Sequence, residues 1–564
     1  MMDKRYSILI VSVTILVLSL VGTASATNWS VDGSGGADFT GIQDAINNAK
    51  EGDTILVYSG IYYENVVVDK SVTLRGIGHP IVDANGSDSA ITLTADGITL
   101  EGFTVANSGR WSQYDAGINV NSNNNNIRSN NVSNNSGSGI SLSFSSNNNT
   151  ITGNNASNNR KGIYLSSSCS NTITSNTARN NFVGIYLKES CNNNITGNNV
   201  SNNDDGIDLF FSSNNNVAGN NVRSNEWGIA VFCSSNNTIT GNNVSSNRVG
   251  IGLTDSSNNN TLTSNTFVND SLFVMDSYHN TVEDNRVNGK PLVYLEDASD
   301  YRVNDAGQVI LVNCNNITVE NLDLSNTSVG VEVLETENCI ISKNTVSRIF
   351  LNYSHNNTIT GNNVSSNNYY DDGIFLGYSS NNTITGNSVC NNYRGIHLVV
   401  SCNNNIMSNN VSNNNWGGIV LFFSSNKNTI TGNNVSNNYG GICLGSSSNN
   451  NTITGNTVSN NYPEGIYSSG SDNLIYLNNF INNTDNAHSS TYSKSTNIWN
   501  SPLEITYTYD GTTYKSYLGN YWDDYEVTDA EGDGIGDTHY SIDSEKDESD
   551  AYPLMKPFEN YILP

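Results

Sequence analysis

The chain has 564 residues, with 24 Lys plus Arg against 52 Asp plus Glu, and a formal net charge of -28 at pH 7. A field of that sign repels polyanions, which excludes nucleic acid as a natural partner. Only 13% of the residues are charged, because Asn, Ser, Thr and Gly supply most of the polar groups. Apolar residues recur among them at fixed positions, which argues against a disordered chain.

Residues 1–26 read as a secretory signal peptide. Lys4 and Arg5 precede an apolar run over residues 8–21, and Ala24-Ser25-Ala26 offers small residues for cleavage after Ala26. No later stretch approaches the roughly 20 apolar residues that a membrane-spanning helix needs. We therefore expect a secreted protein, extracellular or at the cell surface, with no membrane span.

Residues 27–110 are expected to form an N-terminal cap and the first coils of a repeat structure. Thr40-Gly41-Ile42-Gln43 has the spacing of a capping box and opens the amphipathic run GIQDAINNAK. This run predicts a lid helix, which would cover the unpaired strand edges at the end of a stack.

The body of the chain repeats a short frame. Gly-Ile pairs at Gly162, Gly184, Gly206, Gly228 and Gly250 follow one another at intervals of 22 residues, and phrases such as NTITGNN and NVSNN lie between them. Each unit thus holds three short alternating segments separated by Asn, Ser and Gly turns. This predicts an all-β fold, a right-handed single-stranded parallel β-helix with three short strands per coil of roughly 22 residues and an N-terminal capping helix.

The same frame divides the remaining sequence into four segments. Regular repeats are expected over residues 111–266 and 335–485, because the Gly-Ile frame is kept there. The frame lapses over 267–334, which predicts irregular coils with an insertion. Residues 486–564 are expected to form a C-terminal cap that carries an acidic loop.

Three of the eight cysteines occupy the same place in their repeats: Cys169, Cys191 and Cys402. Cys169 and Cys191 are one coil apart, so they should stack closely enough for a disulfide. A column of small buried residues needs no bridge, and we favour reduced, stacked cysteines.

Candidate contact residues follow from the alternation within Gly-Ile-x-Leu, where Ile and Leu point inward and the residue between them points outward. This outward column and the turn just before each Gly are enriched in aromatic and charged residues. Aromatic faces stack on sugar rings, and the coil rise of about 4.8 Å is close to the length of one sugar unit. The predicted carbohydrate-binding residues are Lys161, Tyr164, Tyr186, Trp227, Arg248, Tyr370, Asp371, Asp372, Tyr393, Arg394 and Trp416, with His397 beside them. The alternative is that these exposed turns vary in sequence without a function.

These residues form two patches, one from Lys161 to Arg248 and one from Tyr370 to Trp416, and four acids within the first patch suggest catalysis as an alternative function. Asp205 and Glu226 fall on adjacent coils, so their carboxyl groups could lie about 5 Å apart, as in retaining glycoside hydrolysis. Asp204 and Asp208 would raise the pKa of a neighbouring acid and favour a proton donor. The catalytic candidates are therefore Asp205, Glu226, Asp208 and Asp204.

The acidic loop near the C-terminus places oxygen ligands at alternating positions. Asp529, Glu531, Asp533 and Asp537 surround Gly534 in the manner that a calcium loop requires, although Tyr540 stands where a bidentate Glu would come. We predict a structural Ca²⁺ site that locks the C-terminal cap. The alternative is an acidic, solvated turn.

The ITGNN coils, the central GKPLVYL and AGQVILVNCNNITVENLDLS, and the terminal GNYWDDYEVTDAEGDGIGDTHYSID together resemble the NosD-like, pectin-lyase-like group of surface proteins. This resemblance implies a β-helix associated with carbohydrate binding or sugar hydrolysis. Asp205-Gly206-Ile207-Asp208 also looks like part of a polygalacturonase motif, whose further motifs are missing here. The founder of the NosD family serves copper delivery, yet this chain has five Met and six scattered His, few for a copper site.

These observations lead to three hypotheses about function. The first, which we favour, is a secreted cell-surface β-helix that binds polysaccharide or envelope glycan along its outward strand face without catalysis. The second is a polysaccharide hydrolase or lyase of the pectin-lyase-like type, and the third is a copper-maturation protein. The sequence does not identify the glycan or the oligomeric state.

Overall fold

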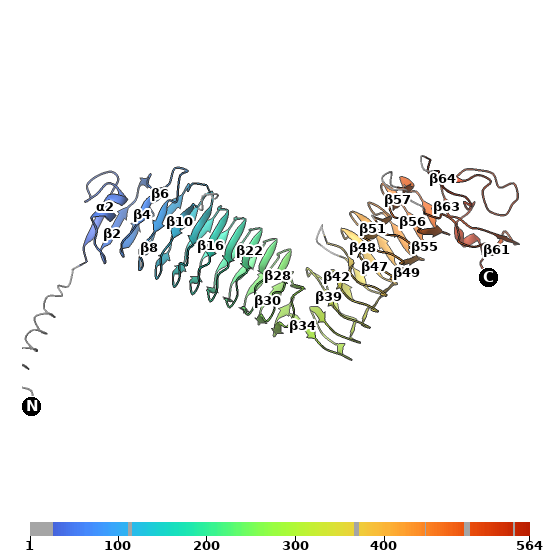
Figure 1. The fold of residues 1–564 in the computed structure, drawn as a ribbon, viewed down its shortest axis with the longest axis horizontal. Helices are drawn as coiled ribbons and strands as arrows, with labels where there is room; N and C mark the ends of the chain where they lie inside the picture. The colour runs from blue at the N-terminus through green and yellow to red at the C-terminus, as the bar shows by residue number, and fades with distance from the viewer. Residues whose placement is uncertain (1–25, 111–114, 366–370, 446, 490–496, 545–546) are drawn as a thin grey trace, which may run out of the picture. The chain divides into compact units, whose positions relative to one another are not determined.

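The structure is a computed structural model that describes residues 26–110, 115–365, 371–445, 447–489, 497–544 and 547–564. The chain forms two compact units, Met1–Asn194 and Ile195–Pro564. In each unit short parallel strands stack coil upon coil, as Figure 1 shows, and this confirms the predicted parallel β-helix. Among the described residues no helix is long and apolar enough to span a membrane. The signal peptide lies outside these residues except for Ala26.

The first unit begins with the lid helix α2 (Ile42–Asn48), which buries Ile42, Ala45 and Ile46. The capping box predicted from Thr40 is wrong, because the N-cap is Gly41 and no side chain of the cap makes a hydrogen bond. The carboxylate of Glu64 instead accepts the backbone N–H groups of Ile42 and Gln43 at 2.9 and 2.8 Å. An acid from the neighbouring coil thus satisfies the first helical donors.

Three parallel sheets run the length of this unit. One sheet holds β1 (Asn28–Val31), β2 (Thr54–Tyr58), β5 (Thr73–Ile77), β8 (Thr99–Glu101), β11 (Asn126–Arg128), β14 (Thr150–Thr152) and β17 (Thr172–Thr174). The second holds β3 (Ile61–Tyr62), β6 (Ile81–Asp83), β9 (Thr104–Ala106), β12 (Asn131–Ser133), β15 (Asn155–Ser157) and β18 (Thr177–Arg179). The third holds β4 (Val66–Val68), β7 (Ile91–Leu93), β10 (Ala116–Val120), β13 (Ser138–Leu142), β16 (Lys161–Ser166) and β19 (Val183–Lys188).

The repeat fixes both the register and the core. Ile163 pairs with Ile185 and Tyr164 with Tyr186, so equivalent residues lie on the same rung. Ile163 and Leu165 are fully buried, whereas Tyr164 between them is partly exposed, as the alternation predicts. The branched side chains therefore form continuous inward columns along the coil axis.

The two asparagines of each Asn-Asn turn have different tasks. Asn158 is exposed and left-handed, with φ 56°, a region that Asn tolerates better than most residues. Its neighbour Asn159 is buried. Buried asparagines of successive coils form ladders in which each donates its backbone N–H and its side-chain amide to the next Oδ1, as Asn130 does to Asn154 at 3.0 and 3.0 Å. The ladders satisfy polar groups that the corners would otherwise bury without partners.

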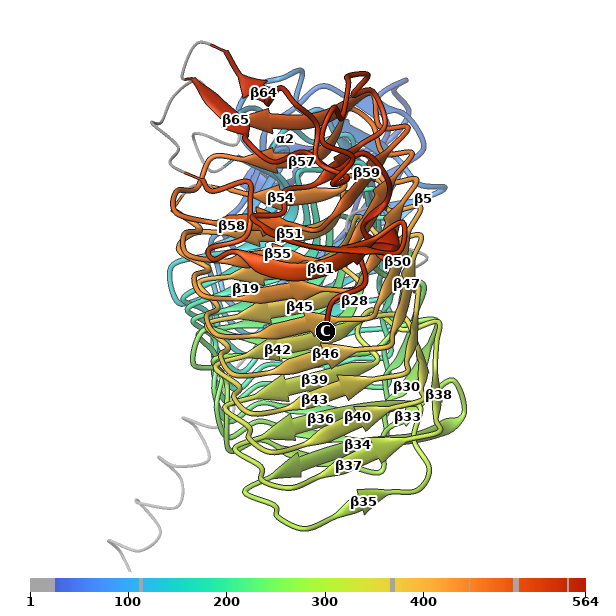
Figure 2. The same ribbon diagram turned by 90° about the vertical axis from the view of Figure 1, so that its right-hand side faces the viewer.

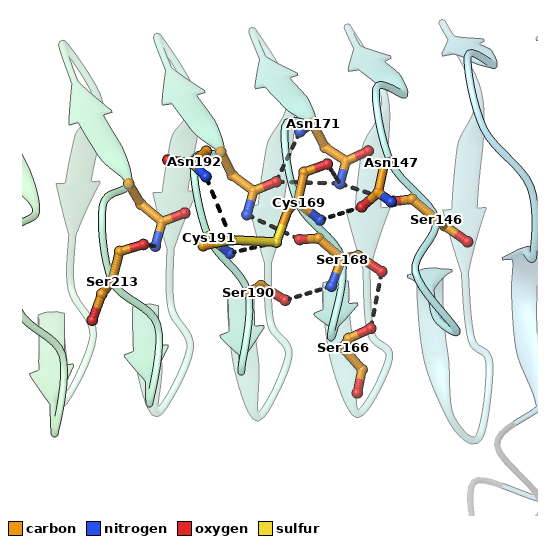
Figure 3. The surroundings of a disulfide bond; sticks show 12 residues. Ser146, Asn147, Ser166, Ser168, Cys169, Asn171, Ser190, Cys191, Asn192 and Ser213 are labelled. Atoms are coloured by element: carbon orange, nitrogen blue, oxygen red, sulfur yellow. Dashed lines mark hydrogen bonds between the residues drawn. A yellow bond between two sulfur atoms is a disulfide. The ribbon is translucent and has the colours of Figure 1, made fainter.

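Cys169 and Cys191 form a disulfide between adjacent coils, with Cα atoms 4.8 Å apart (Figure 3). The expectation of reduced, stacked cysteines is therefore wrong for this pair. The Asn147 side chain accepts the N–H of Cys169 from the preceding coil, so the bridge stands in a corner ladder of polar side chains. Cys402, at the same repeat position, forms no disulfide.

The second unit contains two runs of coils, and one sheet in each run carries most of the candidate residues. In the first run this sheet holds β22 (Asp205–Phe210), β25 (Trp227–Phe232), β28 (Val249–Thr254) and β31 (Leu272–Met275). In the second run a separate sheet holds β34 (Lys290–Glu296), β36 (Gln308–Val312), β39 (Val331–Leu334), β42 (Ile349–Asn352), β45 (Ile374–Gly377), β48 (Arg394–Val399), β51 (Gly417–Phe422), β54 (Ile442–Leu444), β57 (Glu464–Ser468) and β60 (Asp485–Ser489).

The other sheets of this unit are also parallel ladders. In the first run they extend from β23 (Asn216–Ala218) to β32 (Thr281–Glu283) and from β21 (Asn199–Ser201) to β33 (Arg286–Val287). In the second run they extend from β35 (Arg302–Val303) to β58 (Leu474–Tyr476) and from β38 (Asp323–Leu324) to β63 (Tyr521–Trp522). Figure 2 shows the successive strands β35, β37 (Thr318–Glu320), β40 (Ile340–Ser342) and β43 (Thr358–Thr360) as one such ladder.

The two runs meet where the Gly-Ile frame lapses. Strand β33 turns back and pairs antiparallel with β34, so the coil path is interrupted there. The open edge of β31 is then closed by side chains of the second run. Gln308 bonds to both the N–H and the carbonyl of Leu272, and the buried Glu332 carboxyl accepts the N–H of Val274. Burial raises the pKa of Glu332 well above its usual value.

The C-terminal cap consists of the hairpin β61 (Ile505–Tyr509) and β62 (Thr512–Ser516), the pair β64 (Tyr540–Asp543) and β65 (Glu548–Asp550), and the short helix η2 (Phe558–Asn560). Trp499 and Trp522 are buried beneath it against the last coils. The asparagine ladders end on its acids: Asp550 accepts the N–H of Asn520 and the indole N–H of Trp522. The carboxylates of the cap thus take the place of the asparagine that a further coil would supply as a hydrogen-bond acceptor.

Candidate functional site

In the first unit, three of the predicted contact residues form one cluster on the outward side of β16 and β19. The Tyr164 and Tyr186 rings are stacked, with centroids 5.4 Å apart and an interplanar angle of 18°. The Lys161 Nζ lies over both rings, 3.5 Å from the centroid of Tyr164 and 4.5 Å from that of Tyr186. The rung spacing of the coils accounts for this stack, since both tyrosines occupy the same repeat position.

In the second unit, the predicted acids lie at the start of β22 and on the coil that follows. Asp205 is on the same rung as Trp227 and Asp208 is beside Ala230. The backbone carbonyl of Asp204 accepts the N–H of Trp227, which brings Asp204 and Glu226 to neighbouring positions of the turn. Burial first, and then the charges of Asp204 and Glu226, raise the pKa of Asp205 to about 6.

Arg248 connects these acids to the second run of coils. Its guanidinium donates to Glu226 at 2.8 Å and lies 3.6 Å from the carboxylate of Asp371. Asp371 and Asp372 are both buried. Residues that the sequence placed in two separate patches are thereby joined into one charged cluster within the second unit. Tyr370, another predicted contact residue, lies outside the described residues.

Asp372 is the centre of the second patch. Its carboxylate bonds to the Nδ1 of His397 at 2.8 Å and to Arg394 at 3.3 Å. Burial alone would raise the pKa of Asp372, but the hydrogen bond and charge of His397 and the charges of Arg348 and Arg394 outweigh it and hold the pKa below its usual value. Within the described part of the chain, the buried Nε2 of His397 has no hydrogen-bond partner.

A continuous series of ring contacts, here called the ring track, crosses from the first run of coils to the second. It comprises Trp227, Phe273, Phe350, Phe375, His397, Phe422 and Trp416, with successive centroids 6.5, 5.6, 5.0, 5.4, 5.8 and 5.6 Å apart. Successive side chains of a strand point to opposite faces, and Phe273, Phe350, Phe375 and His397 stand between the inward-pointing residues of their strands. Offset and edge contacts at these distances stabilise aromatic pairs.

Two guanidinium groups lie over the track. Arg348 lies 5.0 Å from the centroid of Phe350, and Arg394 lies 4.8 Å from that of Tyr393 and 4.7 Å from that of Trp416. The track therefore offers aromatic faces together with donors and acceptors, the groups that contact sugars through their ring faces and hydroxyls. Phe350 and His397 are only 5% and 6% exposed, whereas Trp227, Phe375 and Trp416 are half-buried.

Phe273, Phe350, Arg348 and Phe422 were not among the predicted contact residues. The first three belong to coils in which the Gly-Ile frame is absent, so no repeat position identified them. Phe273 and Phe350 could have been found from the alternation in the short segments LFVM and IFLN, because each is the second residue and lies between two buried ones. Phe422 occupies the next outward position after Val420 on its strand.

In the acidic loop near the C-terminus, Asp529 and Asp537 accept hydrogen bonds from backbone N–H groups of the loop itself. The Asp529 carboxylate accepts N–H groups of Gly532, Asp533 and Gly534, at 2.7, 3.2 and 2.8 Å. Asp537 accepts the Thr528 hydroxyl and the Ala530 N–H. Glu531 is exposed. Among the described residues no three His, Cys, Asp or Glu side chains gather as a metal site, so Asp529, Glu531, Asp533 and Asp537 do not converge in this arrangement.

The family described as "Periplasmic copper-binding protein (NosD)" matches residues 46–207, 145–275, 293–421 and 347–527, which together span more than half of the chain. A cell surface glycoprotein of Methanothermus fervidus is 32% identical over 106 residues, 18% of this chain and 17% of that protein. The aligned part is thus well under two thirds of that relative's length.

Two solved structures are similar to this chain at low sequence identity. DFA-IIIase of Arthrobacter chlorophenolicus A6, without its lid and in complex with GF2, is 14% identical, covers 63% of this chain and 94% of its own, and has a TM-score of 0.31. An alginate lyase in complex with G6 is 12% identical, covers 64% of this chain and 86% of its own, and has a TM-score of 0.34. Similarities at these identities and scores carry no argument about function.

Proposed function

The chain belongs to the NosD family, and from that premise we propose that it is a cell-surface protein that binds a polysaccharide or envelope glycan along the outward face of its β-helix. The observation that carries this proposal is the ring track from Trp227 to Trp416. The surface glycoprotein relative and the signal-like N-terminus support the location.

The ring track suits an extended glycan because Phe350, Phe375 and His397 lie on successive rungs of one sheet. Successive rungs are about 4.8 Å apart, so a chain of sugar units can meet an outward side chain at each coil. The half-buried faces of Trp227, Phe375 and Trp416 can stack on sugar rings. The nearly buried Phe350 and His397 hold these rings in place, and Arg394 and Arg248 can donate to hydroxyl groups.

The proposal is tested by measuring retention of the mature protein on a panel of insoluble polysaccharides. We expect the double variant Trp227→Ala/Trp416→Ala to lose at least roughly tenfold in affinity for a polysaccharide that the wild type binds. Tyr301→Ala is the matched control, because Tyr301 is 51% exposed and lies off the track. Wild-type protein that is retained on no polysaccharide, or a double variant that binds as well as the wild type, contradicts the proposal.

A polysaccharide hydrolase is the second candidate function, and the environment of Asp205 favours it. A carboxyl with a pKa near 6 suits a proton donor to a glycosidic oxygen, and Glu226, ion-paired with Arg248, is the neighbouring carboxylate. Chain shortening by the wild type that disappears in both Asp205→Asn and Glu226→Gln supports catalysis. Retention on the polysaccharide without shortening supports binding alone.

Copper delivery, which the family description suggests, finds no donor set in the described residues. No group of three His, Cys, Asp or Glu side chains is present there, and Met275, Met407 and Met555 belong to well-separated segments. Copper sites require such clusters of soft or imidazole ligands. We therefore do not propose a role in copper delivery.

A further inference from the structure

A cavity of about 520 Å³ opens on the outward side of β51, β54 and β57, next to the end of the ring track. This volume falls within the roughly 300–1,000 Å³ typical of small-molecule sites. Five aromatic side chains and one acid stand out in its lining: Trp416, Phe422, Phe423, Tyr439, Tyr467 and Glu464.

The cavity exists because one coil lacks large outward side chains. This coil reads YGGICLG, and its Gly440, Gly441, Cys443 and Gly445 line the cavity. Phe422 from the preceding coil lies across Gly445, where an added Cβ would come within 1.9 Å of the Phe422 ring. Any larger residue at Gly445 would push this ring out of place, so the glycine is needed for the aromatic wall.

The rings are held in fixed positions around this space. Cys443, Tyr467 and His488 occupy successive rungs, and the Tyr467 ring is stacked on the His488 ring with centroids 5.8 Å apart. The other face of Tyr467 is therefore directed towards the small Cys443 and the cavity. Trp416 contacts the Phe422 ring edge-on at 5.6 Å, which fixes the opposite wall.

Glu464 is the one charged side chain among the described residues that line the cavity. Burial raises its pKa, and Asp485 on the next coil raises it further, while His488 lowers it. The nearest cation over the lining rings, Arg394, is paired with Asp372. The cavity thus combines the negative faces of several rings with a carboxyl group that has no cationic partner among the ion pairs of the described residues.

We propose that this cavity binds an organic cation: a substituted ammonium group whose carbon substituents pack on the rings and whose charge faces Glu464. A cation over aromatic faces is stabilised most when it is desolvated, as in a lined cavity. A polyhydroxylated sugar fits the same space less well, because each buried hydroxyl needs a hydrogen-bond partner and most of the lining is apolar. The cavity shares Trp416 and Phe422 with the ring track, whereas Glu464 and Tyr439 lie outside the track.

The test titrates the full mature protein with choline and follows tryptophan fluorescence and heat of binding. The neutral isostere 3,3-dimethyl-1-butanol has the same shape without the charge. We expect saturable binding of choline, with the isostere roughly tenfold weaker or more. Binding of choline should also weaken as the pH falls through the raised pKa of Glu464, because protonation removes the negative charge.

Two variants and a control complete the test. Glu464→Gln and Tyr439→Leu should each weaken choline binding roughly tenfold, and Tyr439, 51% exposed, can be replaced with little effect on folding. Tyr301→Leu should leave it unchanged. Equal binding of choline and its isostere, no saturable choline binding, or unchanged affinity in both Glu464→Gln and Tyr439→Leu would overturn the proposal.

Discussion

Asn247 donates both its backbone N–H and its side-chain amide to one oxygen of Asp270, at 3.0 and 2.8 Å. Asp270 stands where the next asparagine of the ladder would be, and no further coil continues this ladder because the chain turns back at β34. Its other oxygen accepts the N–H of Ser271 and the hydroxyl of Ser328. An acid ends the ladder well because it offers two acceptors and requires no acceptor from a further coil.

This end of the ladder makes stability depend on pH. Burial raises the pKa of Asp270 to about 7 from 3.8, so the unfolded chain loses this proton at lower pH than the folded chain does. The free energy of unfolding should fall by about 4 kcal/mol as the pH rises from about 4 to about 7. Asp270→Asn cannot titrate, and we expect denaturant unfolding of this variant to lose that slope.

Asp270→Asn should also lower the free energy of unfolding by an amount that does not depend on pH. This constant loss can be told apart from the change in pH dependence. The amide group of the variant would face the Ser271 N–H, a buried donor left without an acceptor, and this should cost about 1–3 kcal/mol at every pH. Asp284→Asn, which changes an exposed acid of the same run, serves as the control and should keep the wild-type slope. The ladder-end explanation fails if Asp270→Asn and the wild type show the same pH dependence.

The interior of a ladder should be more sensitive than its exposed neighbours. Asn225 accepts the backbone and side-chain N–H groups of Asn203 and donates its own to Asn247, each at 2.9 or 3.0 Å. Asn225→Ala leaves two buried donors of Asn203 without this acceptor, so we expect a loss of about 2–4 kcal/mol in the free energy of unfolding.

Asn243→Ala provides the matched comparison, since Asn243 is exposed and its amide makes a single side-chain contact with Asn221 at 3.3 Å. Its cost should stay below about 1 kcal/mol. Equilibrium unfolding of both variants under identical conditions measures the difference. Similar midpoints for the two would mean that the buried ladder adds little to stability.

The sequence predicts the regular coils well, because a repeated Gly-Ile frame fixes both the rung and the face of each residue. Tyr164 and Tyr186 could be placed side by side on that basis, whereas Asp205, which the sequence paired with Glu226, lies on the rung of Trp227. The junction could not be predicted, since the lengths of its coils vary and its contacts join the two runs. The contact of Arg248 with Asp371 and the closure of the β31 edge by Gln308 and Glu332 depend on where the second run begins.

The cavity near β54 escaped prediction for a different reason. The outward column identified Cys443 and Tyr467 as surface positions, but a hollow arises from what is missing on one coil. Three glycines and a cysteine between aromatic neighbours give no positive signal in the pattern, and only the packing of Phe422 over Gly445 reveals the space.

The disulfide should stabilise the first unit. Cys169 and Cys191 close a loop with a sequence separation of 22 residues, and chain entropy assigns such a loop about 3 kcal/mol. The double variant Cys169→Ser/Cys191→Ser keeps the corner hydrogen bonds possible, because Ser213 at the same repeat position accepts the N–H of Ser235. We expect a lower thermal midpoint for the variant, a similar decrease for the wild type in reductant, and none for Cys402→Ser. Equal midpoints for the wild type and the double variant would contradict this.

The acidic loop of the C-terminal cap allows a test of the calcium prediction. Asp529→Ala removes the acceptor of three loop N–H groups, so it should destabilise the cap whether or not calcium is present. Calcium binding predicts more: the melting temperature of the wild type should rise when a chelator is replaced by excess Ca²⁺, and Asp529→Ala should abolish the rise. Glu531→Gln, on an exposed side chain, separates a ligand from a turn residue, because it should weaken only the response to calcium. A wild-type melting temperature that is the same in chelator and in Ca²⁺ would leave Asp529 as a turn-forming residue and remove calcium from the account of the cap.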